Sequence, residues 1–243
     1  MHLNRVYCAT PLTPAQRVTL RGNAAGHISR VLRLRVGEQL TLFDGTGGEH
    51  SARIDSAGGG TVTVTLLEHC AVERESPLML TLAQGISRGE RMDWVVQKAT
   101  ELGVTRISPL LTERSVVRLD AQQALKKHAH WSAVCVAACE QCGRNRLPEL
   151  QEPQELPAFL ADPQAGATKL LLSPEGQLRL QDLPRQAPAI TVLIGPEGGL
   201  APAEQAAAIA AGFTPVRLGP RVLRTETAAV AALAIIQREF GDL

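Results

Sequence analysis

Between residues 39 and 68 the hydrophobic and polar positions alternate, and this alternation predicts a β-meander. The segment QLTLFDGTGGEHSARIDSAGGGTVTVTLLE reads as strands with one buried face. The stretches DGTGG and SAGGG interrupt it with residues typical of tight turns. We therefore expect residues 1–73 to form a small β-barrel domain, in which GHISRVLRLR is ambiguous between helix and strand.

A different pattern begins after ERESP, residues 73–77, where charge and a proline indicate a domain boundary. From there, short apolar segments alternate with longer stretches of helical periodicity. The apolar segments are LMLTLAQGI, RISPLLT, KLLLSP, AITVLIG and TPVRLG. Strands that alternate with helices predict an α/β domain with a mostly parallel sheet over residues 74–243.

Several residue patterns predict where helices begin and end. Ser87 and Glu90 have the spacing of a capping box, and the helix that follows is expected to stop at Gly103. Asp120 is expected to cap a long helix, AQQALKKHAHWSAVCVAACEQCG, and Thr225 to cap the last one.

Composition narrows the class of protein. With 243 residues, 44% hydrophobic and 20% charged, the chain is an ordinary globular protein of one large or two modest domains. The N-terminus has no apolar signal region and no apolar run is long enough to span a membrane, so we expect a cytoplasmic protein. Five cysteines, an odd number, do not indicate a disulfide framework.

Charge is informative through its distribution. The net charge is only +1, but no acidic residue precedes Glu38. An acid-free stretch that carries arginines is suited to anions. We therefore expect Arg5, Arg21, Arg30 and Arg33 to contact an anionic partner through its phosphates.

Two segments share one design of strand, Gly-Pro, loop and helix: TVLIGPEGGLAPAEQ and VRLGPRVLRTETAAVAAL. Ligands bind at the carboxyl ends of parallel strands, so the loops at Gly195 and Gly219 are expected to form two walls of one pocket. The alternative is two ordinary turns. The first loop lacks the spacing of known phosphate-binding loops and carries Glu197, which suits a cation better than a phosphate.

Four motifs in the same order resemble one family. LIGPEGGL, LGPRVLRTETAA, EQCGRNRLPE and SRGERMDWVVQKATELGV resemble the RsmE-type 16S rRNA uridine-N3 methyltransferases of the SPOUT superfamily, across essentially the whole chain. The resemblance implies a SPOUT-type α/β domain with a C-terminal trefoil knot, after a PUA-like β-barrel that binds RNA. It also implies a homodimer that acts on 16S rRNA of the small ribosomal subunit.

The resemblance further implies S-adenosylmethionine as methyl donor, without a metal. The residues expected to hold it are Leu172, Ile194, Gly195, Pro196, Gly199, Leu218, Gly219, Val222 and Leu223. Methylation of uridine N3 needs a base or a stabiliser of negative charge. We expect Glu197 as the base and Arg144 or Arg224 as the cationic stabiliser. Helix capping or phosphate contact is the alternative for Arg144.

The cysteines of the long helix allow a second hypothesis. Cys135, Cys139 and Cys142 have the C-x3-C-x2-C spacing of radical S-adenosylmethionine enzymes. On a continuous helix they would spread over about 10 Å, too far for one cluster, so we interpret them as core residues. A non-catalytic RNA-binding protein is the third hypothesis.

Overall fold

The computed structural model describes residues 4–162, 167–183 and 188–243, which divide into two compact units. Unit 1 comprises the chain up to Glu75 together with Val136–Leu147. Unit 2 comprises Ser76–Cys135 and Pro148–Leu243. The first unit boundary, after Glu75, lies within the charged segment 73–77, where the sequence predicted a domain boundary. The sequence did not predict that Val136–Leu147 belongs to unit 1.

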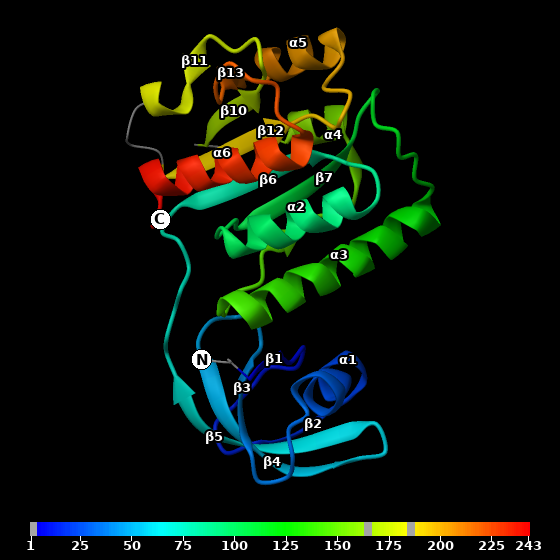
Figure 1. The fold of residues 1–243 in the computed structure, drawn as a ribbon, viewed down its shortest axis with the longest axis vertical. Coiled ribbons are helices and arrows are strands. Elements are labelled where there is room, and N and C mark those ends of the chain that lie inside the picture. The colour runs from blue at the N-terminus through cyan, green and yellow to red at the C-terminus, as the bar shows by residue number, and fades with distance from the viewer. Residues whose placement is uncertain (1–3, 163–166, 184–187) are drawn as a thin grey trace. The chain divides into compact units, whose positions relative to one another are not determined.

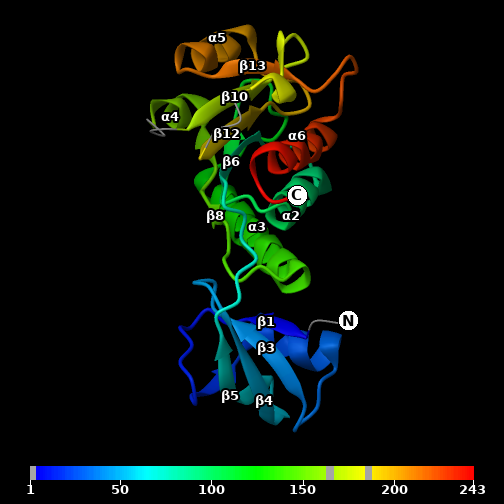
Figure 2. The same cartoon turned by 90° about the vertical axis from the view of Figure 1, so that its left-hand side faces the viewer.

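Unit 1 is built on a sheet whose described strands pair in the order β1-β3-β4-β5-β2 (Figure 2). The strands are β1 Arg5–Tyr7, β2 Arg17–Leu20, β3 Gln39–Phe43, β4 Glu49–Gly58 and β5 Thr61–Cys70. β1 and β3 are parallel and the other pairs are antiparallel. The predicted meander is confirmed as β3, β4 and β5, while closure of this sheet into a barrel stays a prediction.

The segment that the sequence left ambiguous is helical. α1 Gly22–Gly26 is followed directly by a π-helix, His27–Leu32. Ile28 is fully buried in a core that also contains Ile54, Val62 and Val64. Val62 and Val64, alternate residues of β5, therefore share a core with this helical segment. Its exposed residues include Arg30 and also Val31, which is 67% exposed.

Unit 2 contains a sheet of parallel strands. In the described residues they pair in the order β11-β13-β10-β12-β6-β7-β8, and β9 also pairs with β7. The strands are β6 Met79–Gly85, β7 Arg106–Leu111, β8 Glu149–Leu150, β9 Gln154–Glu155, β10 Thr168–Leu172, β11 Leu178–Arg179, β12 Ala189–Ile194 and β13 Thr214–Arg217. The predicted α/β domain with a mostly parallel sheet is confirmed.

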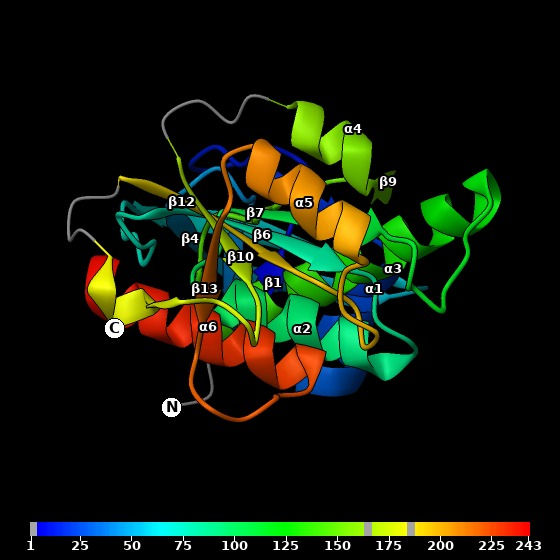
Figure 3. The same cartoon turned by 90° about the horizontal axis from the view of Figure 1, so that it is seen from above.

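Helices cover both faces of this sheet, as parallel sheets require. They are α2 Glu90–Glu101, α3 Ala121–Cys142, α4 Leu156–Ala161, α5 Pro202–Ala210, α6 Thr225–Phe240 and a 3-10 turn, Leu180–Asp182. The part of α3 from Val136 onward belongs to unit 1. Figures 1 and 3 show α2 and α6 on one face and α4 and α5 on the other. Ile190 and Val192 of β12 pack in the first core and Leu193 in the second. None of the described helices is long and apolar enough to cross a membrane.

Three predictions of helix ends can be compared with the structure of unit 2, and two of them are confirmed. Asp120 caps α3, because its Oδ1 accepts a hydrogen bond of 2.7 Å from the backbone of Gln123. Gly103 follows α2 with φ of +75°. The capping box at Ser87 was wrong: the residue before α2 is Gly89, with φ of +64° and no side-chain cap. The positive φ that glycine tolerates turns the chain into the helix there.

Candidate functional site

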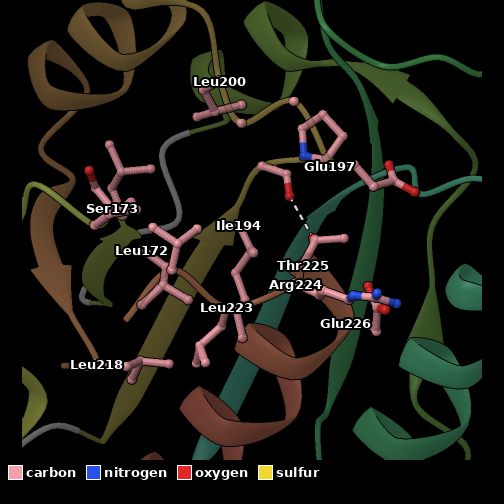
Figure 4. A pocket seen from close by; sticks show the side chains of 18 of the residues that line it. Leu172, Ser173, Ile194, Glu197, Leu200, Leu218, Leu223, Arg224, Thr225 and Glu226 are labelled. Carbon is pink, nitrogen blue, oxygen red and sulfur yellow. Dashed lines mark hydrogen bonds between the residues drawn. The ribbon is translucent and has the colours of Figure 1, made fainter. Parts of the chain in front are cut away.

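A pocket of about 650 Å³ lies at the carboxyl ends of three neighbouring strands, β12, β10 and β13 (Figure 4). Its walls come from the loops that follow these strands, from the start of α6 and from Arg91 of α2. The carboxyl edge of a parallel sheet is where such folds bind ligands. The two Gly-Pro loops therefore form walls of one pocket, as their sequences predicted.

Every residue that we expected to hold a cofactor lines this pocket: Leu172, Ile194, Gly195, Pro196, Gly199, Leu218, Gly219, Val222 and Leu223. Ser173 and Pro174, which follow β10, contribute a third wall that the sequence analysis did not single out. The geometry brings the nine residues together, and their contact with a cofactor stays a prediction.

Glycines shape the first loop by allowing close backbone contacts. A Cβ on Gly195 would lie 2.9 Å from the backbone nitrogen of Leu200, and Gly199 has φ of +67°. Gly85, at the end of β6, is equally restricted, because a Cβ there would lie 2.5 Å from the nitrogen of Pro196. The sequence analysis missed Gly85, although its position at a strand end was a usable signal.

A buried hydrogen-bond cluster of Gln84, Gly195 and Thr225, called the brace below, joins the first loop to the start of α6. The hydroxyl of Thr225 donates a hydrogen bond of 2.7 Å to the carbonyl of Gly195, and it accepts one of 3.0 Å from the Gln84 amide. Gln84 is fully buried and also lies 3.4 Å from the Gly195 carbonyl. The prediction that Thr225 caps α6 was wrong, since Arg224 is the N-cap and the Thr225 hydroxyl is used by the brace.

The second loop offers backbone donors to a ligand. Within the described part of the chain, the N–H groups of Gly219, Arg221, Val222 and Leu223 donate no hydrogen bond. Backbone donors seldom remain unpaired unless water or a ligand satisfies them. These N–H groups are therefore left to water or to a ligand of the pocket.

The pocket has an apolar side and a charged side. Figure 4 shows Leu172, Leu218 and Leu223 on one side and Glu197 and Glu226 on the other. The lining also includes Arg91, Arg221 and Arg224, so the pocket offers charges of both signs and fits an organic ligand with an apolar part and polar groups.

Glu197 is held by several donors. Its Oε1 accepts hydrogen bonds of 3.0 Å from the backbone N–H of Arg88 and from the guanidinium of Arg91. Burial alone would raise the pKa of Glu197, but the N–H groups of Arg88 and of its own backbone, and the Arg91 guanidinium, outweigh it and lower the pKa. The carboxylate therefore ties the start of α2 to the first loop and is weakened as a proton acceptor.

The two arginines considered as stabilisers lie in different surroundings. Arg224 lines the pocket, is exposed and has no side-chain partner within the described residues. Arg144 belongs to unit 1, where its Nε and Nη2 donate to Glu75 at 2.9 and 2.6 Å. With a side chain only 5% exposed, Arg144 is part of a structural ion pair and is not a lining residue of the pocket.

The four N-terminal arginines expected to contact phosphates differ in their exposure to solvent. Arg21, Arg30 and Arg33 are exposed, at and around the π-helix. Arg5 is 1% exposed, pairs with Glu49 and donates to the side chain of Asn145. Its expected role as a phosphate contact is corrected, because the guanidinium faces the interior of unit 1.

The three cysteines of α3 lie on one uninterrupted helix. Cys135 and Cys139 are buried and Cys142 is partly buried. The unwinding that would gather them around a cluster is not observed. Among the described residues, no group of three histidine, cysteine or acidic side chains has a geometry that would hold a metal ion.

Comparison with known protein families gives a consistent match to both parts of the chain. A model described as an RNA methyltransferase domain matches residues 74–237, and one described as an RNA methyltransferase PUA domain matches residues 20–67. The chain therefore belongs to the RNA methyltransferase family.

Individual relatives extend over nearly the whole length. A protein of Buchnera aphidicola subsp. Schizaphis graminum, named ribosomal RNA small subunit methyltransferase E, is 34% identical over 98% of this chain and 97% of its own. A methyltransferase structure from Legionella pneumophila with bound cofactor SAM has a TM-score of 0.96 and 44% identity, with full coverage of both chains. The Neisseria gonorrhoeae ribosomal RNA small subunit methyltransferase E, bound to S-adenosyl methionine, has a TM-score of 0.92 and 40% identity, again with full coverage.

Proposed function

We propose that this chain is an S-adenosylmethionine-dependent methyltransferase of small-subunit ribosomal RNA, and that its target atom is N3 of a uridine. One observation carries the proposal: the pocket at the ends of β12, β10 and β13, in a chain whose solved neighbours bind this cofactor. Its full-length relatives carry the name of a small-subunit rRNA methyltransferase. The N3 position rests on the resemblance of the four motifs.

The pocket suits this cofactor on structural grounds. We propose that Leu172, Leu218 and Leu223 pack against the adenine and that the N–H groups of 219–223 bind its polar edge. When bound, S-adenosylmethionine supplies a methyl group activated by a positively charged sulfur.

The nitrogen that accepts the methyl group must first be made electron-rich. We propose that the exposed guanidinium of Arg224 stabilises the negative charge that develops on the uracil ring. Glu197 stays a candidate base, but the uridine proton would have to compete with the hydrogen bonds that Arg88 and Arg91 already donate to its carboxylate. Arg144 is proposed as a stabilising residue of unit 1.

RNA binding is assigned to unit 1. Arg21, Arg30 and Arg33 are exposed and lie in the region that matches the PUA model. Guanidinium groups bind phosphates without reading the base, so these residues are proposed to position the RNA.

The finer architecture is also proposed from the resemblance. After β13 the chain returns to bond Gly195 through Thr225, and we propose that this return passes through the loop after β10 as a trefoil knot. The five-stranded sheet of unit 1 is proposed to curve into a PUA-like barrel, and the protein to act as a homodimer in the cytoplasm. Sedimentation of the purified protein tests the dimer.

The deciding experiment is a mass map of ribosomal RNA modifications in a strain that lacks the gene. Loss of one methylated uridine from small-subunit rRNA, restored by the wild-type gene, is expected. An unchanged map, together with RNA binding by the purified protein, would favour the non-catalytic hypothesis. An activity that requires reconstituted iron would favour the radical one.

A further inference from the structure

Two carboxylates lie at the charged side of the pocket, and their surroundings differ. Glu197 accepts hydrogen bonds from Arg88 and Arg91. Glu226, in the first turn of α6, forms one ion pair within the described residues: its Oε1 lies 3.9 Å from Nε of Arg91. That separation is too long for a direct hydrogen bond.

Glu226 also keeps an acceptor that the described residues leave unused. Its Oε2 is shielded from solvent and has no hydrogen-bond partner among them. A shielded polar atom without a partner is rare in native structures, because its desolvation is not compensated. Such an atom in a pocket wall indicates that a ligand completes its bonding.

The backbone of Glu226 is held in place, although one oxygen of its carboxyl group accepts no hydrogen bond within the described residues. The side chain lines the pocket and is 15% exposed. The preceding residue, Thr225, is anchored to Gly195 in the first loop. The terminal torsion of glutamate is soft, so either oxygen can turn toward the pocket without moving the backbone.

We propose that Glu226 is the general base that accepts the N3 proton of the target uridine. This inference rests on the proposed methyltransferase function. The N3–H bond breaks and its proton passes to the Glu226 carboxylate, while the N3 electron pair forms the new bond to the methyl carbon. The carbon–sulfur bond breaks with its electrons on sulfur, which becomes a neutral thioether.

This assignment gives the neighbouring residues separate roles. Arg91 lies between the two carboxylates and is a positioning residue that limits where Glu226 can turn. Glu197 fixes Arg91 and the start of α2. The base is therefore the carboxylate with the fewest competing donors, since a proton acceptor must be open to the substrate.

The test compares wild type with Glu226→Gln and with Glu239→Gln, an exposed glutamate near the other end of α6. Methyl transfer to small-subunit rRNA is followed in single turnovers over a range of pH. Calorimetry measures the affinity for S-adenosylmethionine and for its uncharged product, S-adenosylhomocysteine. Circular dichroism and thermal melts confirm that each variant folds.

Glu226→Gln is expected to slow methyl transfer by about a hundredfold or more at neutral pH, in the range usual for a general base. Its rate should recover partly at higher pH, where hydroxide removes the N3 proton, and both affinities should match wild type. Glu239→Gln should behave as wild type.

Two results would overturn the assignment. In one, Glu226→Gln transfers methyl groups at the wild-type rate. In the other, it loses affinity for the charged cofactor but not for the uncharged product, which would make Glu226 a counter-ion. Failure of the proposed function itself would differ from both, because the wild-type protein would then transfer no methyl group.

Discussion

Glu197 and Glu226 are the same residue type in the same pocket, yet the surrounding donors give them different chemistry. The loop sequence placed Glu197 beside the expected cofactor and so favoured it as a base. In the structure its Oε1 bonds to Arg88 and Arg91, and the net effect of burial and these donors lowers its pKa. Its main contribution is therefore expected in the stability of the loop.

Replacing Glu197 with glutamine should remove a pH-dependent part of the stability. Because the folded-state pKa is lowered, the ionised carboxylate stabilises the fold above the ordinary glutamate pKa of about 4.3. That contribution is lost as the pH falls through the lower folded-state pKa. Thermal melts of Glu197→Gln should thus lie below wild type at pH 7 and converge with it in acid. A constant difference at all pH values would contradict this.

At the scale of elements, the pocket depends on a bond between two loops that are distant in sequence. Thr225 at the start of α6 joins the Gly195 carbonyl at the end of β12, and Gln84 from β6 completes the brace. Two strands and a helix thereby meet at one buried polar cluster. Loops that line a pocket are otherwise mobile, so such a brace keeps the binding geometry formed.

Thr225→Val should loosen this brace with little change in side-chain shape. It removes the hydroxyl that bonds to both the Gln84 amide and the Gly195 carbonyl, at a cost of about 1–3 kcal/mol in the free energy of unfolding. Urea unfolding measures this cost, and calorimetry should show weaker binding of S-adenosylmethionine. Thr227→Val, at an exposed position of the same helix, is the matched control. Equal stability of the two variants would contradict the brace.

At the scale of the whole molecule, unit 1 includes a segment from the middle of the chain. Arg144 pairs with Glu75, and Arg5 binds the carbonyl of Arg144 and the side chain of Asn145. The motif EQCGRNR, which looked catalytic in the sequence, is largely used to hold this segment in place. Its buried charges are paired, as buried charges must be.

Arg144→Ala should destabilise unit 1 strongly, since it leaves the Glu75 carboxylate without its guanidinium partner in a poorly solvated site. Removing one member of a buried pair typically costs about 3–5 kcal/mol. Arg146→Ala is the control: its ion pair with Glu73 is 55% and 39% exposed, and about 1 kcal/mol or less is expected. Urea unfolding and hydrogen exchange in β1 and β4 measure both. If Arg144→Ala kept full stability but lost methyl transfer, this result would support Arg144 as a catalytic residue and contradict the structural role.

RNA binding by unit 1 should depend on salt through the exposed arginines. Arg30→Ala and Arg33→Ala are each expected to reduce the slope of log affinity against log salt by about one unit, because each removes one phosphate contact. Filter binding to small-subunit rRNA at several salt concentrations measures the slope, and affinity for S-adenosylmethionine should not change. Unchanged slopes would place the RNA contacts elsewhere.

The sequence by itself determined the elements and the location of the pocket. Periodicity located the meander, the five longer parallel strands and helices α2, α3, α5 and α6, because the burial of apolar side chains follows the geometry of each element. The short elements β8, β9, β11 and α4 were not predicted. The paired Gly-Pro loops located the pocket, because the carboxyl ends of parallel strands share one edge of a sheet. The four motifs identified the family.

Only the tertiary structure decided which charged side chains are available. Arg5, Arg144 and Glu197 carry the residue types that phosphate binding and catalysis need, but each is engaged by partners far away in the sequence. Gln84 gave no chemical signal in the sequence, and Gly85 gave only its position at a strand end. Both became part of the site through contacts with Gly195, Pro196 and Thr225. Pairing and burial depend on residues brought together by folding, and local sequence does not contain that information.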